Sequence, residues 1–256
     1  MDFLKENLLE WSKKVAMKGG RHTLKYFKSS LNIEYKEDHS PVTRADKETE
    51  SIMREMIMEK FPDHGILGEE HGRINSESDI QWIIDPIDGT LSFIHGVPLY
   101  TTLIGILVKG KPVAGVIYAP VLDEMCDAAI GLGTRFNDTE CHVRECRSLA
   151  KATLLTTDIN DVFDNGYEKP YRKLMQSVNI HRSWGDAYGH MLVATGRADI
   201  MFDPLLNIWD AAPLLPVIQE AGGSFTDVKG RATIESGNGY SCNKFLFPQI
   251  QTILNS

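Results

Sequence analysis

Two aspartates that follow an apolar run are the residues best suited to chemistry in this sequence. Residues 82–90 read Trp-Ile-Ile-Asp-Pro-Ile-Asp-Gly-Thr, so Asp85 and Asp88 stand at the end of what we expect to be a buried strand. Two uncompensated anions would be costly there, and a cation is therefore expected between or beside them. Carboxylate oxygens are hard ligands, which favours Mg²⁺ or Mn²⁺ over zinc.

Gly89 and Thr90 extend this motif toward an anion site. Gly89 allows close approach to the backbone, and Thr90 brings a hydroxyl next to backbone N–H groups of the kind that bind phosphate at a helix N-terminus. A metal site and a phosphate site would then be adjacent. Taken alone, a motif of this length is also compatible with a surface turn that carries two solvated aspartates.

A second pair of acids follows a second short apolar run. Glu69 and Glu70 come directly after residues 66–68, which we expect to form a strand. The ends of adjacent strands in an open α/β sheet can converge on one metal centre. Taken alone, two consecutive glutamates more often mean surface charge.

Asp46 and Asp210 are both expected in the first turn of a helix. Thr43-x-x-Asp46 has the form of a capping box, with aspartate in place of the usual glutamate. A capping carboxylate is less available as a base, although the first turn is also a good place to hold a catalytic one, so both roles stay open. Asp210, in the stretch 209–212, would gain from the helix dipole even as a surface carboxylate.

The first half of the chain reads as two helices followed by mostly antiparallel strands. Helices are expected over 3–28, with an interruption at Gly19-Gly20, and from 46 to the Phe61-Pro62 pair. The expected strands are 66–68, 82–84, 99–108, 113–119 and 124–130, of which the last three form an antiparallel sheet.

The second half alternates strands with helices, which predicts a layered α/β unit. The expected strands are 152–157, 181–184, 198–202 and 223–227, and the expected helices are 167–178, 187–196 and 209–221. Pro216 should kink the last helix or define its true beginning. The polar segment 137–149 separates the halves. We therefore divide the chain into an α+β subdomain of residues 1–145, which carries the metal-binding motifs, and an α/β subdomain of residues 146–256, which completes the active site.

Composition and charge restrict the class of partner. The 256 residues are 42% hydrophobic and 24% charged, as in an ordinary soluble globular protein. A formal net charge of −8 argues against a nucleic-acid backbone or an anionic membrane as partner. It allows a phosphorylated substrate, because bound divalent metals reverse the local charge. We expect no signal peptide, and the longest apolar run, 103–108, is too short to span a bilayer.

The four cysteines are expected to be ordinary thiols. Cys141-His142 and Cys146 have a poor spacing for zinc, and the chain has no C-x-x-C pair. A reducing cytoplasm is the location that fits this pattern best.

Taken together, the motifs resemble the inositol monophosphatase family of metal-dependent phosphatases. The matching stretches are Gly68-Glu69-Glu70, Asp85-Pro86-Ile87-Asp88-Gly89-Thr90, Trp209-Asp210-Ala211-Ala212, Glu220-Ala221-Gly222-Gly223 and, upstream, Lys36-x-Asp38-x-Ser40-Pro41-x-Thr43-x-x-Asp46. The resemblance covers nearly the whole chain. It implies a layered α-β-α-β-α sandwich of the type shared with fructose-1,6-bisphosphatase, and a homodimer.

The resemblance also implies a set of metal ligands for two Mg²⁺ ions and a third, weaker one. Glu69, Asp85 and the Ile87 carbonyl would bind the first ion. Asp85, Asp88 and Asp210 would bind the second, and Glu69 with Glu70 the third. Mn²⁺ is an alternative ion.

The implied reaction is hydrolysis of a phosphate monoester by a water activated by Mg²⁺, which attacks phosphorus in line. Thr90 and Asp46 match the pair that orients and deprotonates this water, and Glu70 is counted with them as catalytic. The backbone amides of Gly89 and Thr90 would hold the phosphate. Because no covalent phospho-enzyme is needed, no Ser, Cys or His nucleophile is assigned.

The substrate is a small phosphorylated metabolite, and histidinol phosphate is the expected one. The stretch 183–190 and Phe202-Asp203-Pro204 resemble the family members named histidinol-phosphatases. Two acids, Asp186 and Asp203, would suit a leaving group that carries a protonated amine and an imidazole. The residues expected to touch substrate are Asp88, Gly89, Thr90, Asp186, Asp203 and Asp210.

Other substrates and another class of protein remain as alternatives. An inositol ring needs hydroxyl partners, of which Asp203 could supply one; other sugar phosphates, fructose 1,6-bisphosphate and nucleotide phosphates are further candidates. An inactive relative that binds or regulates would have lost a metal ligand, whereas every position named above is filled. The roles of His71 and His190 stay open.

Overall fold

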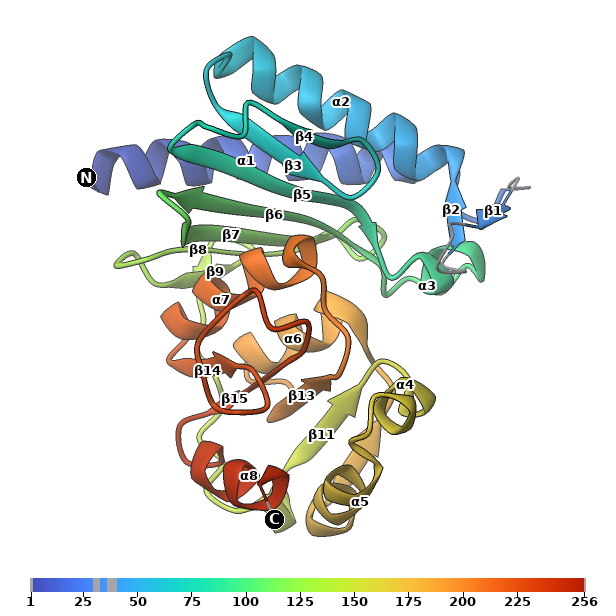
Figure 1. The fold of residues 1–256 in the computed structure, drawn as a ribbon, viewed down its shortest axis with the longest axis vertical. Coiled ribbons are helices and arrows are strands. Elements are labelled where there is room, and N and C mark those ends of the chain that lie inside the picture. The colour runs from blue at the N-terminus through green and yellow to red at the C-terminus, as the bar shows by residue number, and fades with distance from the viewer. Residues whose placement is uncertain (1, 30–32, 36–40, 256) are drawn as a thin grey trace.

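A computed structural model describes residues 2–29, 33–35 and 41–255. The chain stacks as helices, sheet, helices, sheet and helices (Figure 1). The outer helices α1 (Asp2–Thr23) and α2 (Arg44–Lys60) cover the first sheet, while α6 (Asp186–Ala194) and α7 (Ile208–Glu220) lie between the two sheets. The predicted α-β-α-β-α sandwich is confirmed.

The first sheet has the strand order β10-β9-β8-β7-β6-β5-β3-β4. Its strands are β3 (Gly65–Gly68), β4 (Gly72–Ile74), β5 (Ile80–Asp88), β6 (Thr101–Val108), β7 (Lys111–Ala119), β8 (Glu124–Ala129), β9 (Thr134–Phe136) and β10 (Thr139–Glu140). β3 and β5 are parallel neighbours, and the other pairings are antiparallel. The carboxyl ends of β3 and β5 therefore meet at the same edge of the sheet.

Side chains alternate between the two faces of this sheet. Along β5, Trp82 and Ile84 pack among the apolar side chains of α1 and α2, whereas Ile83 packs among those of α6 and α7. On β6, Ile104 and Leu103 repeat the alternation. Because the sheet is buried on both faces, its central strands read as nearly continuous apolar runs.

α7 lies very close to β6 and β7 at two glycines. A Cβ at Gly105 would lie 2.7 Å from the Cβ of Ala212, and one at Gly115 would lie 2.2 Å from the carbonyl oxygen of Pro213. The absence of a side chain at both positions permits this approach of two backbones. The approach sets the position of α7, and with it that of Asp210 in its first turn.

Gly115→Ala is expected to lower the free energy of unfolding by about 1–3 kcal/mol, because the new methyl group collides with backbone that cannot rotate away. Urea denaturation measures this. Gly65→Ala is the matched control, since the three atoms nearest to a Cβ there belong to the end of the Gln81 side chain and not to backbone. Equal losses in the two variants would contradict the close approach of α7 to β7.

The second sheet has the order β12-β11-β13-β15-β14. Its strands are β11 (Thr153–Thr156), β12 (Ile180–Arg182), β13 (Ile200–Asp203), β14 (Gly223–Thr226) and β15 (Gly239–Asn243). Its outer face is covered by α4 (Ile159–Asp164), α5 (Glu168–Ser177) and α8 (Phe247–Leu254), and a short 3-10 helix spans Leu149–Lys151. The sequence patterns did not predict α4, α8 or β15. The division of the chain at residue 145 stays a prediction, and α7 packs on strands of the first half.

Several predicted boundaries are wrong. The first helix ends at Thr23 rather than 28, and Gly19 and Gly20 do not interrupt it. These glycines instead let α1 lie close to side chains of α2 and β7. α7 begins at Ile208 and includes Pro216, so this proline does not mark its start. The segment before α2, expected as a polar loop, contains the antiparallel pair β1 (Ile33–Tyr35) and β2 (Pro41–Thr43).

Three residues of the upstream motif, Lys36, Asp38 and Ser40, lie outside the described residues. The four cysteines carry free thiols. No helix in the described part of the chain combines the length and apolar character needed to cross a bilayer.

Candidate active site

The parallel pair β3 and β5 brings the two acidic motifs together. Gly68 pairs with Ile84, and the backbone N–H of Glu69 continues the ladder by donating to the Ile84 carbonyl at 3.3 Å. The carboxyl group of Glu69 lies close enough to that of Asp85 to raise its pKa. The predicted convergence of the two strand ends is confirmed.

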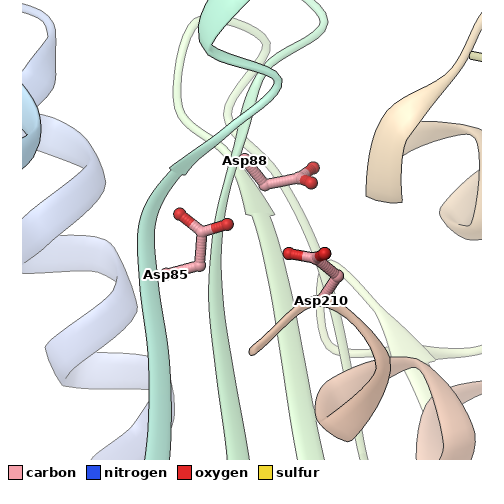
Figure 2. Close-up of side chains that lie close together, drawn as sticks. All are labelled: Asp85, Asp88 and Asp210. Carbon is pink, nitrogen blue, oxygen red and sulfur yellow. The ribbon is translucent and has the colours of Figure 1, made fainter. Parts of the chain in front are cut away.

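An irregular strand end turns Asp85 and Asp88 toward the same space. In a regular strand, residues three positions apart point to opposite faces. The pairing of β5 with β6 shifts register between these two residues, as at a β-bulge. Their carboxylates meet that of Asp210, which comes from the first turn of α7, and one oxygen of each lies within 4.8 Å of the others (Figure 2).

The crowding of like charges in this acidic cluster, Asp85, Asp88 and Asp210, changes its protonation. Burial raises the pKa of Asp85 well above its usual range, and the charges of Glu69, Asp88 and Asp210 raise it further. Burial also raises the pKa of Asp88 to about 6 and, with the charge of Asp88, that of Asp210. A bound cation would relieve this repulsion, and the donor set of hard oxygens fits a divalent metal such as Mg²⁺.

Hydrogen bonds orient each carboxylate of the cluster. Asp85 Oδ1 accepts from its own turn, at the Ile87 N–H (2.9 Å), and Asp210 Oδ2 accepts from the Asn207 N–H (2.7 Å) in a capping box. Asp88 Oδ2 accepts from the Thr101 hydroxyl (2.8 Å) and the Ala187 N–H (2.9 Å). Thr101 and Ala187 were not predicted, since only the fold brings β6 and the start of α6 to Asp88.

Asp46 forms the capping box that its sequence motif predicted. Its Oδ2 accepts from the N–H (2.8 Å) and hydroxyl (2.6 Å) of Thr43. Burial raises the pKa of Asp46 to about 6, although the bonds from Thr43 lower it. The charge of Glu69 raises this pKa further, so the two carboxylates are electrostatic neighbours. Capping and a role near the metal site are therefore compatible.

Thr90 begins α3 (Thr90–Ile94) directly after the acidic strand end. Its hydroxyl donates to the carbonyl of Ile87 at 3.2 Å. Among the hydrogen bonds of the described residues none joins Thr90 to Asp46, so their joint action on a water stays a prediction. Gly89 has a φ of +81°, and a Cβ there would lie 2.7 Å from Asp186 Oδ2. Only glycine fits this position without strain or collision.

A second group of acids lies beside the cluster. Thr157 Oγ1 accepts from the Asp186 N–H at 2.8 Å and donates to Asp203 Oδ2 at 3.1 Å, so it links the two aspartates. Burial raises the pKa of Asp203 to about 8 and that of Asp186 well above its usual range, and the charge of Asp88 raises both. Asp161, on the unpredicted α4, adds a further negative charge.

The sequence held a partial signal for Thr157. This residue is the last of the predicted strand 152–157, and Asp203 directly follows the predicted strand 198–202. It held none for Asp161, because the short helix α4 has no clear period. Asp186 is held at a positive φ of +54°, which aspartate tolerates better than most residues.

The two histidines lie in different settings. His190 is buried, its Nδ1 lies 2.6 Å from Ser241 Oγ, and its Nε2 lies 3.9 Å from Asp203 Oδ2. Burial lowers the pKa of His190 to about 3, so its ring is neutral. His71 is exposed, and its Nε2 contacts the Lys47 carbonyl on α2 at 3.0 Å.

Comparison with known proteins agrees with this geometry. The model of the inositol monophosphatase family matches residues 4–255. The histidinol-phosphatase of Chlorobaculum parvum is 41% identical over 232 residues, which cover 90% of each chain. The inositol-1-monophosphatase of Synechocystis is 36% identical over 71% of this chain and 65% of its own. The crystal structure of the extragenic suppressor protein suhB from Bartonella henselae matches with a TM-score of 0.92 at 32% identity, covering 98% of this chain and 99% of that one. The chain therefore belongs to the inositol monophosphatase family, and it is a metal-dependent phosphatase that hydrolyses phosphoric monoesters.

Proposed function

We propose that this phosphatase uses Mg²⁺ and that its substrate is histidinol phosphate. The observation that carries the substrate is the pair of carboxyl groups next to the acidic cluster, the buried Asp203 and the half-buried Asp186. The name of the Chlorobaculum relative supports the same substrate.

The proposed metal ligands are those named from the motifs. Glu69, Asp85 and the Ile87 carbonyl would hold one ion, Asp85 with Asp88 and Asp210 a second, and Glu69 with Glu70 a weaker third. Bound Mg²⁺ would lower the pKa of a water and neutralise negative charge on the phosphoryl group. The repulsion within the acidic cluster supports this assignment, because an ion would offset it.

The remaining steps belong to the chain itself. The backbone N–H groups of Gly89 and Thr90 would hold phosphate oxygens at the start of α3. Asp46, with a pKa of about 6, is half in its basic form near pH 6 and can take a proton from water close to neutral pH. The hydroxyl of Thr90, which donates a hydrogen bond to the carbonyl of Ile87, would orient that water together with Asp46.

Asp186 and Asp203 would receive the leaving group. A protonated amine brought between them would lower the pKa of both carboxyls and restore their charge, because opposite charges stabilise each other strongly in a partly desolvated pocket. The second candidate substrate is inositol 1-phosphate. It is favoured by the Synechocystis relative and by the protonated form of Asp203 below pH 8, which can hydrogen-bond to a hydroxyl group.

A side-by-side measurement of kcat/KM with Mg²⁺ for L-histidinol phosphate and myo-inositol 1-phosphate separates these substrates. We expect a preference for histidinol phosphate that falls about 10–100-fold in Asp186→Ala and in Asp186→Asn, since a hydrogen bond to a charged group is worth about 1.5–3 kcal/mol. Asp186→Asn is the better matched change, because asparagine also tolerates the positive φ. A preference for inositol phosphate, or no effect of either variant, would refute the substrate and leave the metal chemistry intact.

A homodimer and a cytoplasmic location are also proposed, and sedimentation of the purified chain tests the first of these. Mg²⁺-dependent hydrolysis of a generic phosphate monoester distinguishes the active enzyme from an inactive binding relative.

A further inference from the structure

A buried carboxylate on α2 holds the backbone that follows β3. Glu50 has a side chain that is 0% exposed. Its Oε2 accepts from the backbone N–H of Glu70 at 2.6 Å, and its Oε1 accepts from that of His71 at 3.0 Å. The motifs did not single out this residue, because it lies on the buried face of an ordinary amphipathic helix.

Arg54, one helical turn later, completes the contact. Its Nε donates to Glu50 Oε1 at 2.7 Å, and its Nη2 donates to the carbonyl of Gly72. At Gly68 a Cβ would lie 2.2 Å from Glu50 Oε1, so glycine is needed for this approach. The segment 68–72 is thus held by α2 from its first residue to its last.

Burying a carboxylate is costly unless all of its hydrogen bonds are made, so an apolar side chain would cover this loop at lower cost. Glu50 instead binds the N–H groups of the two peptides that follow Glu69, those of Glu70 and His71. The same helix carries Asp46 one turn earlier, also buried. α2 therefore fixes Asp46 and the segment 68–72 relative to each other as one body.

We propose that Glu50 is a positioning residue which, together with Arg54, holds Glu69 and Glu70 against the acidic cluster in the geometry that metal binding requires. This inference rests on the proposed function, since Glu69 and Glu70 are assigned to metal there. Residues that orient metal ligands through a second layer of hydrogen bonds typically change metal affinity 10–100-fold when they are replaced.

Glu50→Gln tests the proposal without a change of size. A glutamine offers one acceptor oxygen and turns an N–H group toward donors, so at least one backbone bond is lost. Hydrogen exchange of a peptide covering 65–74 is expected to accelerate about tenfold or more. The dissociation constant for Mn²⁺, measured from the spin-resonance signal of the free ion, is expected to rise about 10–100-fold. Neither readout depends on turnover.

Asp199→Asn is the matched control. Asp199 is also a buried carboxylate that accepts from a backbone N–H, that of Thr153 (2.7 Å), and from an arginine, Arg144 (3.0 Å). It precedes β13, at the opposite end of that strand from Asp203. We expect the melting temperature of Asp199→Asn to fall about as much as that of Glu50→Gln. Its hydrogen exchange in 65–74 and its Mn²⁺ binding are expected to stay at the wild-type level.

Wild-type Mn²⁺ binding in Glu50→Gln, or unchanged exchange in 65–74, would overturn the proposal. If Glu50→Gln does not fold, Arg54→Lys takes its place, because lysine keeps the charge but cannot donate to both Glu50 and the Gly72 carbonyl. Hydrogen exchange in 65–74 and the dissociation constant for Mn²⁺ are then expected to rise by smaller factors. A wild-type chain that binds neither Mg²⁺ nor Mn²⁺ would refute the metal function itself, which distinguishes that failure from the failure of Glu50 alone.

Discussion

Asp88→Asn is expected to lower kcat/KM about 10³-fold, which corresponds to about 4 kcal/mol of lost transition-state stabilisation. Both hydrogen bonds to Asp88, from Thr101 and from Ala187, reach Oδ2. The carbonyl oxygen of asparagine can accept both, and its amide group then takes the place of Oδ1. The substitution therefore keeps the local structure while it removes one charge and one ligand atom from the acidic cluster.

The same variant is expected to unfold at a higher temperature than the wild type in the presence of a chelator. The charge of Asp88 raises the pKa of Asp85 and Asp210, so its removal relieves repulsion in the metal-free chain. Mg²⁺ should then add less stability than it adds to the wild type. Thermal melts with EDTA and with Mg²⁺ measure both effects.

Asp127→Asn provides the control for Asp88→Asn. Asp127 is a buried carboxylate on β8 whose pKa burial also raises to about 6, but it faces Lys13 of α1 rather than the acidic cluster. The activity of Asp127→Asn and its response to Mg²⁺ are expected to stay at the wild-type level. Full activity of Asp88→Asn would refute the metal assignment.

Asp203→Asn is expected to stabilise the metal-free chain at high pH by about 5 kcal/mol, because each unit of pKa shift corresponds to about 1.4 kcal/mol, and to raise its melting temperature by roughly 10–20 °C. Burial raises the pKa of Asp203 from 3.8 to about 8. Between these values the folded chain holds a proton that the unfolded chain has lost, so this group makes stability fall as pH rises from about 4 to 8. Asparagine cannot ionise, and it can still accept the bond from Thr157.

Melting curves of wild type and Asp203→Asn with EDTA, at pH 5 and at pH 9, test this sign. The difference between the two proteins should be small at pH 5, where Asp203 is protonated, and large at pH 9, where the wild type buries a charge. A difference that is the same at both pH values would mean that Asp203 is ionised throughout. If the proposed substrate is correct, Asp203→Asn should also lower kcat/KM for histidinol phosphate more than kcat/KM for inositol 1-phosphate.

Local patterns accounted for much of this molecule. The positions of Glu69 and Asp85 after apolar runs predicted two strand ends, and the parallel pairing of β3 with β5 confirmed that they meet. Capping boxes act between residues three positions apart, which is why the one at Asp46 could be read directly from the sequence. Periodicity predicted helices followed by strands in the first half and an alternation of the two in the second, whereas the order of the layers came from the resemblance to the family.

Short or irregular elements were missed for the opposite reason. α4 spans Ile159–Asp164 and is too short to establish a period, so Asp161 could not be placed near Asp186 and Asp203. The first helix was drawn too long because a periodic pattern does not mark where a chain leaves its helix. Pro216 was also expected to kink α7 or to mark its beginning. The helix instead begins at Ile208 and includes this proline, because its close packing on Gly105 and Gly115 holds it in place.

The sequence alone defined the chemistry of the site: carboxylates, a glycine with a hydroxyl neighbour, and the order of the family motifs. Folding defined which of these groups share one space. Asp210 reaches Asp85 because α7 packs on two glycines of the central sheet, and Asp88 is bound by the start of α6. Glu50 supports the loop of Glu69 from a different helix. Such contacts join segments far apart in the chain, and they depend on interlocking surfaces that no local periodicity records.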